Sequence, residues 1–95
     1  MHFVYVLKSL KDGKRYIGLT NDIPKRLQRH NDGEVSATKG RRPFILIHSE
    51  QYKTRSEAAR REIFLKSGKG REELDQIVGN NVEVPAADKP ATRKG

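Results

Sequence analysis

Two short apolar segments separated by a turn signal constrain the fold more than any other feature of this sequence. Residues 2–7 are β-branched, aromatic and apolar on both faces, which is typical of a central strand. Asp12-Gly13 follows after a short gap, and residues 15–20 have the pattern of a returning strand. The sequence therefore predicts an antiparallel hairpin whose two-residue turn is centred on Asp12-Gly13.

A helix is expected directly after this hairpin. Asn21 and Asp22 can cap a helix, Pro24 suits its first turn, and Gly33 is a typical stop. The following residues 34–43 are polar and basic and predict a loop.

One more strand and two helices follow. Residues 44–50 are apolar on both faces and predict a buried third strand. Thr54 and Glu57 form a capping box that opens a second helix over about 55–67, and residues 71–78 predict a short third helix.

The element order β-β-α-β-α-α places the chain in the α/β class. We expect a small, three-stranded, mainly antiparallel sheet flanked by helices, in one domain over residues 1–78. From residue 79 the sequence turns to Asn, Pro, Ala and Lys, which predicts a disordered polar tail over 79–95.

The charge balance indicates a polyanionic partner. Twenty Lys and Arg face twelve Asp and Glu, giving a formal net charge of +8, and most of the excess lies on residues 1–78. A folded body this positive attracts nucleic acid, because phosphate contacts release counterions. The chain has no Cys, which fits a cytoplasmic setting, and its first apolar run is too short for a signal segment or a membrane span.

Two tyrosines fall on one face of the predicted hairpin. In a two-residue turn Tyr5 pairs with Thr20, and strand alternation puts Tyr5, Tyr16, Gly18 and Thr20 on the same side. Either the two phenols flank a bare Gly18 where a phosphate can approach the backbone, or they are simply packed as half-buried core.

Arg26 and His30 lie one turn apart on the first predicted helix. His30 ends the apolar stripe of Ile23 and Leu27, so we expect it at the boundary between core and solvent. Arg26 is suited to bind phosphate, since its guanidinium donates two hydrogen bonds and stays charged. The alternatives are a solvated arginine and a hydrogen-bonded boundary histidine.

Glu62 stands in the apolar stripe of the second predicted helix, between Ala58 and Leu65. A carboxylate facing the core is costly unless it is paired or holds a cation. Arg61 and Lys66 offer an ordinary ion pair. A magnesium ion bound by one carboxylate, several waters and a substrate phosphate is the other interpretation.

Together these residues resemble the GIY-YIG nuclease family. Phe3-Val4-Tyr5 stands where the first motif stands, and Tyr16-Ile17-Gly18 matches the second motif without change. Arg26, His30 and Glu62 follow at family spacing, and residues 66–71 look like the same run in small stand-alone members. The resemblance covers roughly residues 2–78.

The resemblance implies a one-metal nuclease site, with one Mg²⁺ or Mn²⁺ ion as cofactor. By resemblance Glu62 would bind the metal, Tyr16 or Tyr5 would assist activation of the attacking water, Arg26 would clamp the scissile phosphate, and His30 would support that network. Four further positions are our expected nucleic-acid contacts, namely Gly18, Lys39, Arg41 and Arg42.

Three functions follow as hypotheses. The first is a magnesium-dependent endonuclease that hydrolyses phosphodiester bonds in DNA, with DNA favoured over RNA as partner and DNA repair or recombination as its setting. The second is a binding module with weak or no activity, since neither Asn80 nor Asn81 aligns with the Asn that many catalytic members carry. The third is an RNA- or ribosome-associated protein, although no aromatic RNA-stacking motif is present. We expect no membrane partner, and a monomer or weak homodimer.

Overall fold

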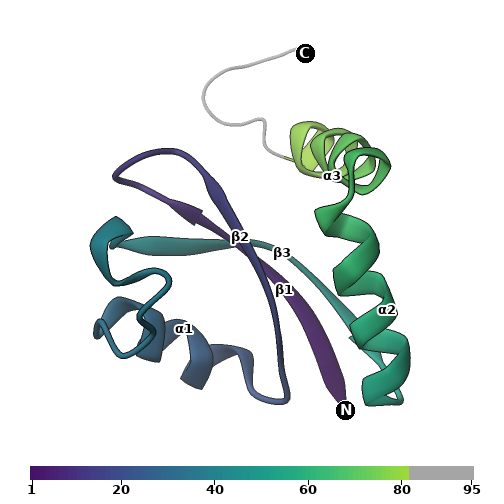
Figure 1. Ribbon diagram of the computed structural model, residues 1–95, viewed down its shortest axis with the longest axis horizontal. Coiled ribbons are helices and arrows are strands. Elements are labelled where there is room, and N and C mark those ends of the chain that lie inside the picture. The colour runs from purple at the N-terminus through teal and green to yellow at the C-terminus, as the bar shows by residue number, and fades with distance from the viewer. Residues whose placement is uncertain (82–95) are drawn as a thin grey trace. The chain divides into compact units, whose positions relative to one another are not determined.

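The structure, a computed structural model, describes residues 1–81, with side chains described through residue 79 (Figure 1). Its elements, with one short 3₁₀ helix η1, are β1 (His2–Ser9), β2 (Arg15–Thr20), α1 (Ile23–Asn31), η1 (Lys39–Arg41), β3 (Phe44–Tyr52), α2 (Arg55–Lys66) and α3 (Gly68–Asn81). The predicted α/β order β-β-α-β-α-α is confirmed. None of the helices in this described part has the length and apolar character needed to span a bilayer.

The chain divides into two compact units, Met1–Phe64 and Leu65–Gly95. The first contains the sheet, α1 and most of α2. The second contains α3, and its described core residues Leu65 and Leu74 are fully buried. The single domain over 1–78 stays a prediction.

The third helix is longer than the sequence predicts. It begins at Gly68 rather than at residue 71, and the Ser67 hydroxyl accepts a hydrogen bond from the Gly70 amide at 3.1 Å. Ser67 therefore caps α3, although two glycines in its first turn disfavour a helix there. Residues 79–81 of the predicted tail belong to this helix, and the rest of that prediction, residues 82–95, lies outside the described residues.

The central strand of the sheet is β1, and the strand order is β2-β1-β3 with both pairs antiparallel. The predicted register is wrong: Tyr5 lies opposite Gly18, not opposite Thr20. The hairpin closes with a hydrogen bond from the Ser9 amide to the Lys14 carbonyl, so its loop has four residues instead of two. A shift of two residues keeps every side chain on its predicted face.

The loop is stabilised by the side chain of Ser9. Its hydroxyl oxygen accepts hydrogen bonds from the backbone amides of Lys11 and Asp12, each at 3.1 Å. Gly13 then takes a φ of 74°, in the left-handed region that glycine adopts readily. These local bonds favour the longer loop over the two-residue turn that Asp12-Gly13 alone suggests.

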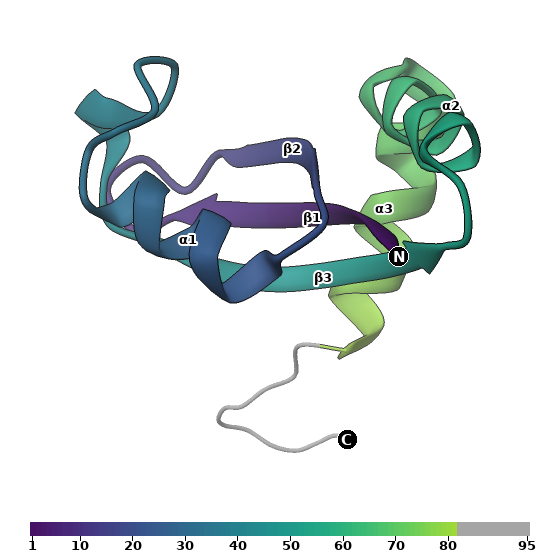
Figure 2. The same ribbon diagram turned by 90° about the horizontal axis from the view of Figure 1, so that it is seen from below.

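Helix α1 packs along one face of the sheet, nearest the viewer in Figure 2. It begins where Asp22 accepts a hydrogen bond from the Lys25 amide at 3.1 Å, and it ends just before Gly33. The core on this face consists of aromatic and aliphatic side chains from three strands and α1, namely Tyr5, Leu7, Tyr16, Ile23, Leu27 and Phe44.

The other face of β1 carries Val4 and Val6, both fully buried. On this face Arg61 of α2 makes two hydrogen bonds to Glu50 of β3, at 2.8 and 3.2 Å. The predicted capping box of α2 is confirmed, because Thr54 and Glu57 exchange hydrogen bonds between side chain and backbone amide in both directions.

Candidate active site

A line of buried hydrogen bonds runs from β1 through α1 to the loop before η1. The Tyr5 hydroxyl lies 2.9 Å from His30 Nε2, and His30 Nδ1 lies 2.8 Å from Thr38 Oγ1. The Thr38 hydroxyl donates to the Val35 carbonyl at 3.3 Å. Thr38 oxygen therefore accepts from Nδ1–H, which leaves Nε2 to accept the proton of Tyr5.

His30 is more deeply buried than the sequence predicts. The helix periodicity predicts a position at the boundary between core and solvent, but the His30 side chain is fully buried. The reason is that the chain after α1 turns back at Gly33 and places Thr38 against the Nδ1 side of the ring. Burial, and then the positive charges of Arg26 and Arg29, lower the pKa of His30, so the imidazole is neutral at neutral pH.

The two tyrosine rings lie on the same face of the sheet, as strand parity predicts. The Tyr16 ring meets the His30 ring edge-on at 5.0 Å between centroids, and the Tyr5 and Tyr16 centroids are 6.3 Å apart. Tyr16 is half-buried, and within the described residues its hydroxyl has no hydrogen-bond partner. Tyr16 is thus the phenol that can donate to, or accept from, a molecule in the site.

Tyr5 is held as a neutral phenol. Burial raises the pKa of Tyr5 to about 12, with further contributions from Tyr16 and the negative charge of Glu62 and opposing ones from the arginines of α1. The charges of Glu62 and Arg26 shift the pKa of Tyr5 in opposite directions, and burial outweighs both.

Gly18 supports Tyr5 rather than offering open backbone. It is buried, and a Cβ atom at this position would lie only 2.5 Å from the Tyr5 hydroxyl oxygen. The interpretation of Gly18 as a bare patch for phosphate is therefore wrong. The first and second tyrosine motifs meet here because the glycine leaves room for the phenol.

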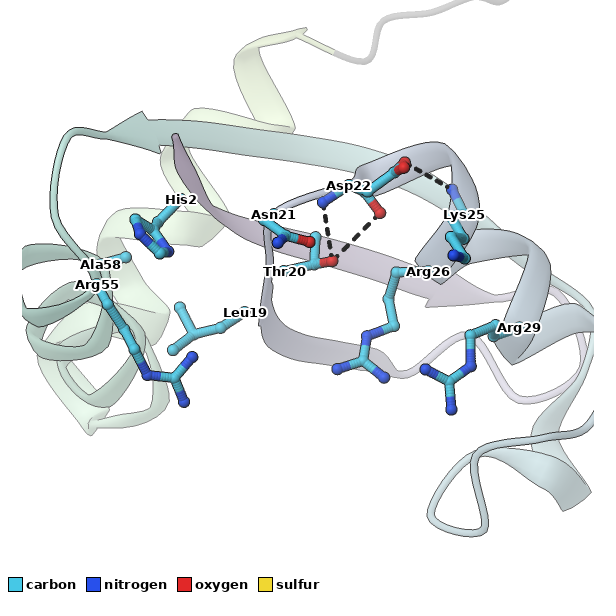
Figure 3. A pocket seen from close by; sticks show the side chains of 10 residues that line it. All are labelled: His2, Leu19, Thr20, Asn21, Asp22, Lys25, Arg26, Arg29, Arg55 and Ala58. Carbon is cyan, nitrogen blue, oxygen red and sulfur yellow. Dashed lines mark hydrogen bonds between the residues drawn. The ribbon is translucent and has the colours of Figure 1, made fainter.

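Arg26 lines a recess of about 320 Å³ beside this cluster (Figure 3). It is half-buried on α1, and its guanidinium has no ion-pair or hydrogen-bond partner among the residues that the structure describes. A partly desolvated, unneutralised guanidinium is suited to bind an anionic oxygen.

Glu62 is half-buried, one turn after Ala58, which lines the same recess as Arg26. Arg61, one of the two ion-pair partners suggested by the sequence, makes two hydrogen bonds to Glu50. Within residues 1–81 no group of three or more His, Asp or Glu side chains gathers as a metal cage. A single carboxylate from the protein is enough for magnesium, which keeps most of its waters and binds substrate phosphate.

The three basic loop residues do not gather at the Arg26 recess. Arg41 donates to Asp12 at 2.9 Å and lies over the Phe44 ring at 5.5 Å, so its guanidinium holds the hairpin loop to the 3₁₀ turn. Arg42 donates to the Lys39 carbonyl at 2.8 Å. Lys39 and Arg42 line a separate, shallow recess together with Lys11.

Two groups of site residues were missed by sequence reasoning. Thr38 orients His30 but stands eight residues further along a loop, and no periodicity connects them. Lys25, Arg29 and Arg55 line the Arg26 recess. For Arg29 a signal existed, because it lies three residues after Arg26 and so shares its helix face.

Comparison with known proteins agrees with this geometry. The profile of the GIY-YIG catalytic domain matches residues 1–75. The chain belongs to the GIY-YIG family, as the motif resemblance predicts, and this family membership implies nuclease activity and nucleic-acid binding in general.

Its individual relatives carry the name UPF0213. The chain is 40% identical over 77 residues to UPF0213 protein SSP2268 of Staphylococcus saprophyticus, which covers 80% of this chain and 93% of that protein. It is 43% identical over 67 residues to a UPF0213 protein of Staphylococcus aureus, covering 70% and 80%. The solution NMR structure of UPF0213 protein BH0048 from Bacillus halodurans is 35% identical, covers 84% of this chain and 87% of that one, and has a TM-score of 0.52.

Proposed function

We propose that this protein is an endonuclease that depends on one divalent metal ion, Mg²⁺ or Mn²⁺, and hydrolyses phosphodiester bonds in DNA. One observation carries the proposal. The half-buried guanidinium of Arg26, which has no partner among the described residues, lines a recess one helical turn before His30, and His30 is hydrogen-bonded to the Tyr5 hydroxyl. Phosphodiester hydrolysis needs positive charge at the phosphate and groups that bind a metal or position a water, and Arg26, Glu62 and the two phenols are groups of these types.

The contacts support the following roles for the site residues. Arg26 binds the scissile phosphate and neutralises charge that develops on it. Tyr16, with its unengaged hydroxyl, positions the attacking water, and Tyr5 assists it from the adjoining strand position. His30 is a positioning residue, because its ring is enclosed between Tyr5 and Thr38 and fixes the direction of the Tyr5 hydroxyl.

Glu62 would hold the metal ion, which when bound lowers the pKa of a water and stabilises negative charge on phosphate oxygens. The neutral Tyr5, with a pKa near 12, makes such help necessary. Lys39 and Arg42, in their separate recess, are proposed as outer contacts to the nucleic acid. A role in DNA repair or recombination, in the cytoplasm and as a monomer or weak homodimer, completes the proposal.

A second candidate is a binding module that does not cleave. The favouring observation is that the Tyr5 hydroxyl is engaged with His30 and strongly disfavours ionisation. Such a protein would still bind nucleic acid through its net charge of +8.

Cleavage assays separate the two candidates. Branched, nicked and duplex DNA are incubated with the protein and Mg²⁺ or Mn²⁺, and products are resolved by size. We expect cleavage by the wild type and a loss of at least about 100-fold in Glu62→Ala. The control is Glu72→Ala, which removes the same charge from an exposed position on α3. Cleavage that survives in Glu62→Ala contradicts the proposed mechanism, and tight binding without any cleavage supports the binding module.

A further inference from the structure

The recess beside Arg26 is large enough for a small organic ligand. Its volume is about 320 Å³, and its lining residues come from the start of β1, the end of β2, the length of α1 and the first turn of α2. Pockets for small organic ligands begin at about 300 Å³. The recess therefore has room for more than the single phosphate that Arg26 would bind.

Its charge is strongly positive. Four of the lining side chains are cationic, namely Lys25, Arg26, Arg29 and Arg55. Asp22 is the only carboxylate among the described residues of the lining, and it already accepts the Lys25 amide as the cap of α1. Arg29 shares its guanidinium with Glu34 at 3.3 Å, whereas Arg55 has no ion-pair partner within the described residues.

The guanidinium groups follow one edge of the recess. Figure 3 shows Arg55, Arg26 and Arg29 pointing to the same side, with Leu19 between Arg55 and Arg26. Arg55 comes from α2 and the other two come from α1, so two separate helices contribute to one row. A polynucleotide backbone presents successive phosphates in such a row.

The rest of the lining is suited to a base. Leu19 is half-buried and Ala58 is fully buried, which gives the recess an apolar part. The His2 imidazole lies beside them, and rings of this kind stack on bases. The Asn21 amide makes no hydrogen bond to any described residue, and it can both donate to and accept from a base edge.

We propose that this recess binds one unstacked nucleotide next to the scissile phosphate, with Arg55 binding its phosphate and its base lying against Leu19 and His2. This inference rests on the proposed function, because it places Arg26 at the scissile phosphate. A base enters a recess only when it leaves its stack. The preferred substrate is therefore a single strand or a frayed or branched end, rather than an intact duplex.

The test is a binding measurement without divalent metal, so that no strand is cut. Fluorescence anisotropy follows the full-length protein on a short labelled single strand and on a blunt duplex of the same sequence, over a range of salt. We expect the single strand to bind at least about tenfold more tightly than the duplex, because base contacts add to phosphate contacts. Equal affinity for the two overturns the proposal.

Two variants test whether Arg55 contacts the phosphate and whether His2 contacts the base. Arg55→Ala should weaken single-strand binding about tenfold and reduce the slope of log K against log salt by about 0.7, as the loss of one phosphate contact requires. His2→Ala should weaken binding about fivefold or more with no change in that slope, since stacking releases no counterions. If both variants bind as the wild type does, the recess is not a nucleotide site.

Arg60→Ala is the matched control. Arg60 is an exposed arginine on the same helix as Arg55, hydrogen-bonded to Ser56 and outside the recess. If Arg55→Ala and Arg60→Ala lose single-strand affinity equally, the assignment of Arg55 is overturned. That result leaves the nuclease proposal unaffected, because the cleavage assay tests it separately. A wild type whose binding does not depend on salt contradicts the proposed function itself.

Discussion

The two faces of the central strand β1 carry two polar networks built from similar residues but completed in different ways. On the face covered by α1, Tyr5, His30 and Thr38 form a buried series of neutral hydrogen bonds. Arg26, whose positive charge helps to lower the pKa of His30, has no ion-pair partner among the described residues.

On the opposite face a carboxylate completes the network. Glu50 accepts hydrogen bonds from Tyr52 at 2.6 Å, from Arg61 at 2.8 and 3.2 Å, and it contacts His48 Nε2 at 2.9 Å. Burial alone would raise the pKa of Glu50, but the bonds from Arg61, Tyr52 and His48 outweigh it and lower the pKa to about 2.

The difference separates stability from function. A carboxylate whose donors are all supplied by the protein stabilises the fold and has little left to offer a ligand. A neutral network next to a guanidinium that has no ion-pair partner leaves that guanidinium available to bind an anion. Tyr5 in the first network and Tyr52 in the second both have a pKa of about 12, so the pKa of the tyrosine does not distinguish the two networks.

The largest expected effect is on activity. Arg26→Ala should lower kcat by about 100- to 1,000-fold, because it removes a charged donor to the transition state. Its melting temperature should stay within a few degrees of wild type, since the guanidinium has no partner within the described residues. Steady-state cleavage gives kcat and thermal melts give the melting temperature. A large fall in the melting temperature of Arg26→Ala would contradict the separation of the functional network from the stabilising one.

Glu50→Ala should lower the stability of the fold and leave the activity unchanged. It leaves the half-buried guanidinium of Arg61 without this carboxylate, at a cost of about 3 kcal/mol in the free energy of unfolding. Under conditions where the variant is still folded, kcat should equal that of the wild type. Urea unfolding followed by circular dichroism gives the free energy, and an equal loss of kcat would place Glu50 in the active site.

Tyr5→Phe should affect both properties. Removing the hydroxyl leaves His30 Nε2 buried without a partner, which costs about 1 to 3 kcal/mol. Tyr52→Phe is the matched control on the other face, with a similar loss of stability and no loss of activity. Cleavage rates corrected for the folded fraction show whether the Tyr5 hydroxyl contributes to activity. Equal rates for Tyr5→Phe and Tyr52→Phe would exclude Tyr5 from the mechanism.

Gly18→Ala should destabilise the fold by about 1 to 3 kcal/mol through overpacking, because the new methyl group meets the Tyr5 hydroxyl. Gly40→Ala is a suitable control, since a Cβ there meets nothing within 4 Å. Thermal melts of the two variants give the comparison. Similar melting temperatures would show that Tyr5 moves aside at no cost.

The smallest expected effect is on acid stability. The pKa of Glu50 is lowered in the folded state from 4.5 to about 2, so its contribution is complete above pH 4.5 and is lost as the pH falls towards 2. Between pH 5 and pH 3 the wild type should lose about 1 to 2 kcal/mol through this group. Glu50→Ala lacks that component, so the gap between the two unfolding free energies should narrow at pH 3.

Local signals in the sequence were sufficient for the elements and for several site residues. The capping box at Thr54 and the cap at Asp22 are short-range hydrogen bonds with a fixed spacing, so the helix starts could be predicted. The position of Glu62 on the face of Ala58 follows from helix periodicity alone. The family resemblance depends on the same spacings.

The length of the hairpin loop and the contacts between distant segments could not be predicted. The Ser9 hydroxyl lengthens the hairpin loop and thereby changes the register, and no turn propensity of Asp12-Gly13 reveals it. Arg41 looks like a phosphate contact in a basic run, yet Asp12 holds it from 29 residues away. The recess of Arg26 and Arg55 likewise exists only once α1 and α2 have been placed on the sheet.

The close approach of Gly18 to Tyr5 makes these two positions a single shared volume. The Tyr5 hydroxyl fills the space that a side chain at position 18 would need. A bulkier residue at one position is then tolerable only if the other becomes smaller, so substitutions there should be made and judged in pairs. Redesign of this sheet face can use that coupling, exchanging both residues together to open a cavity where the phenol now lies.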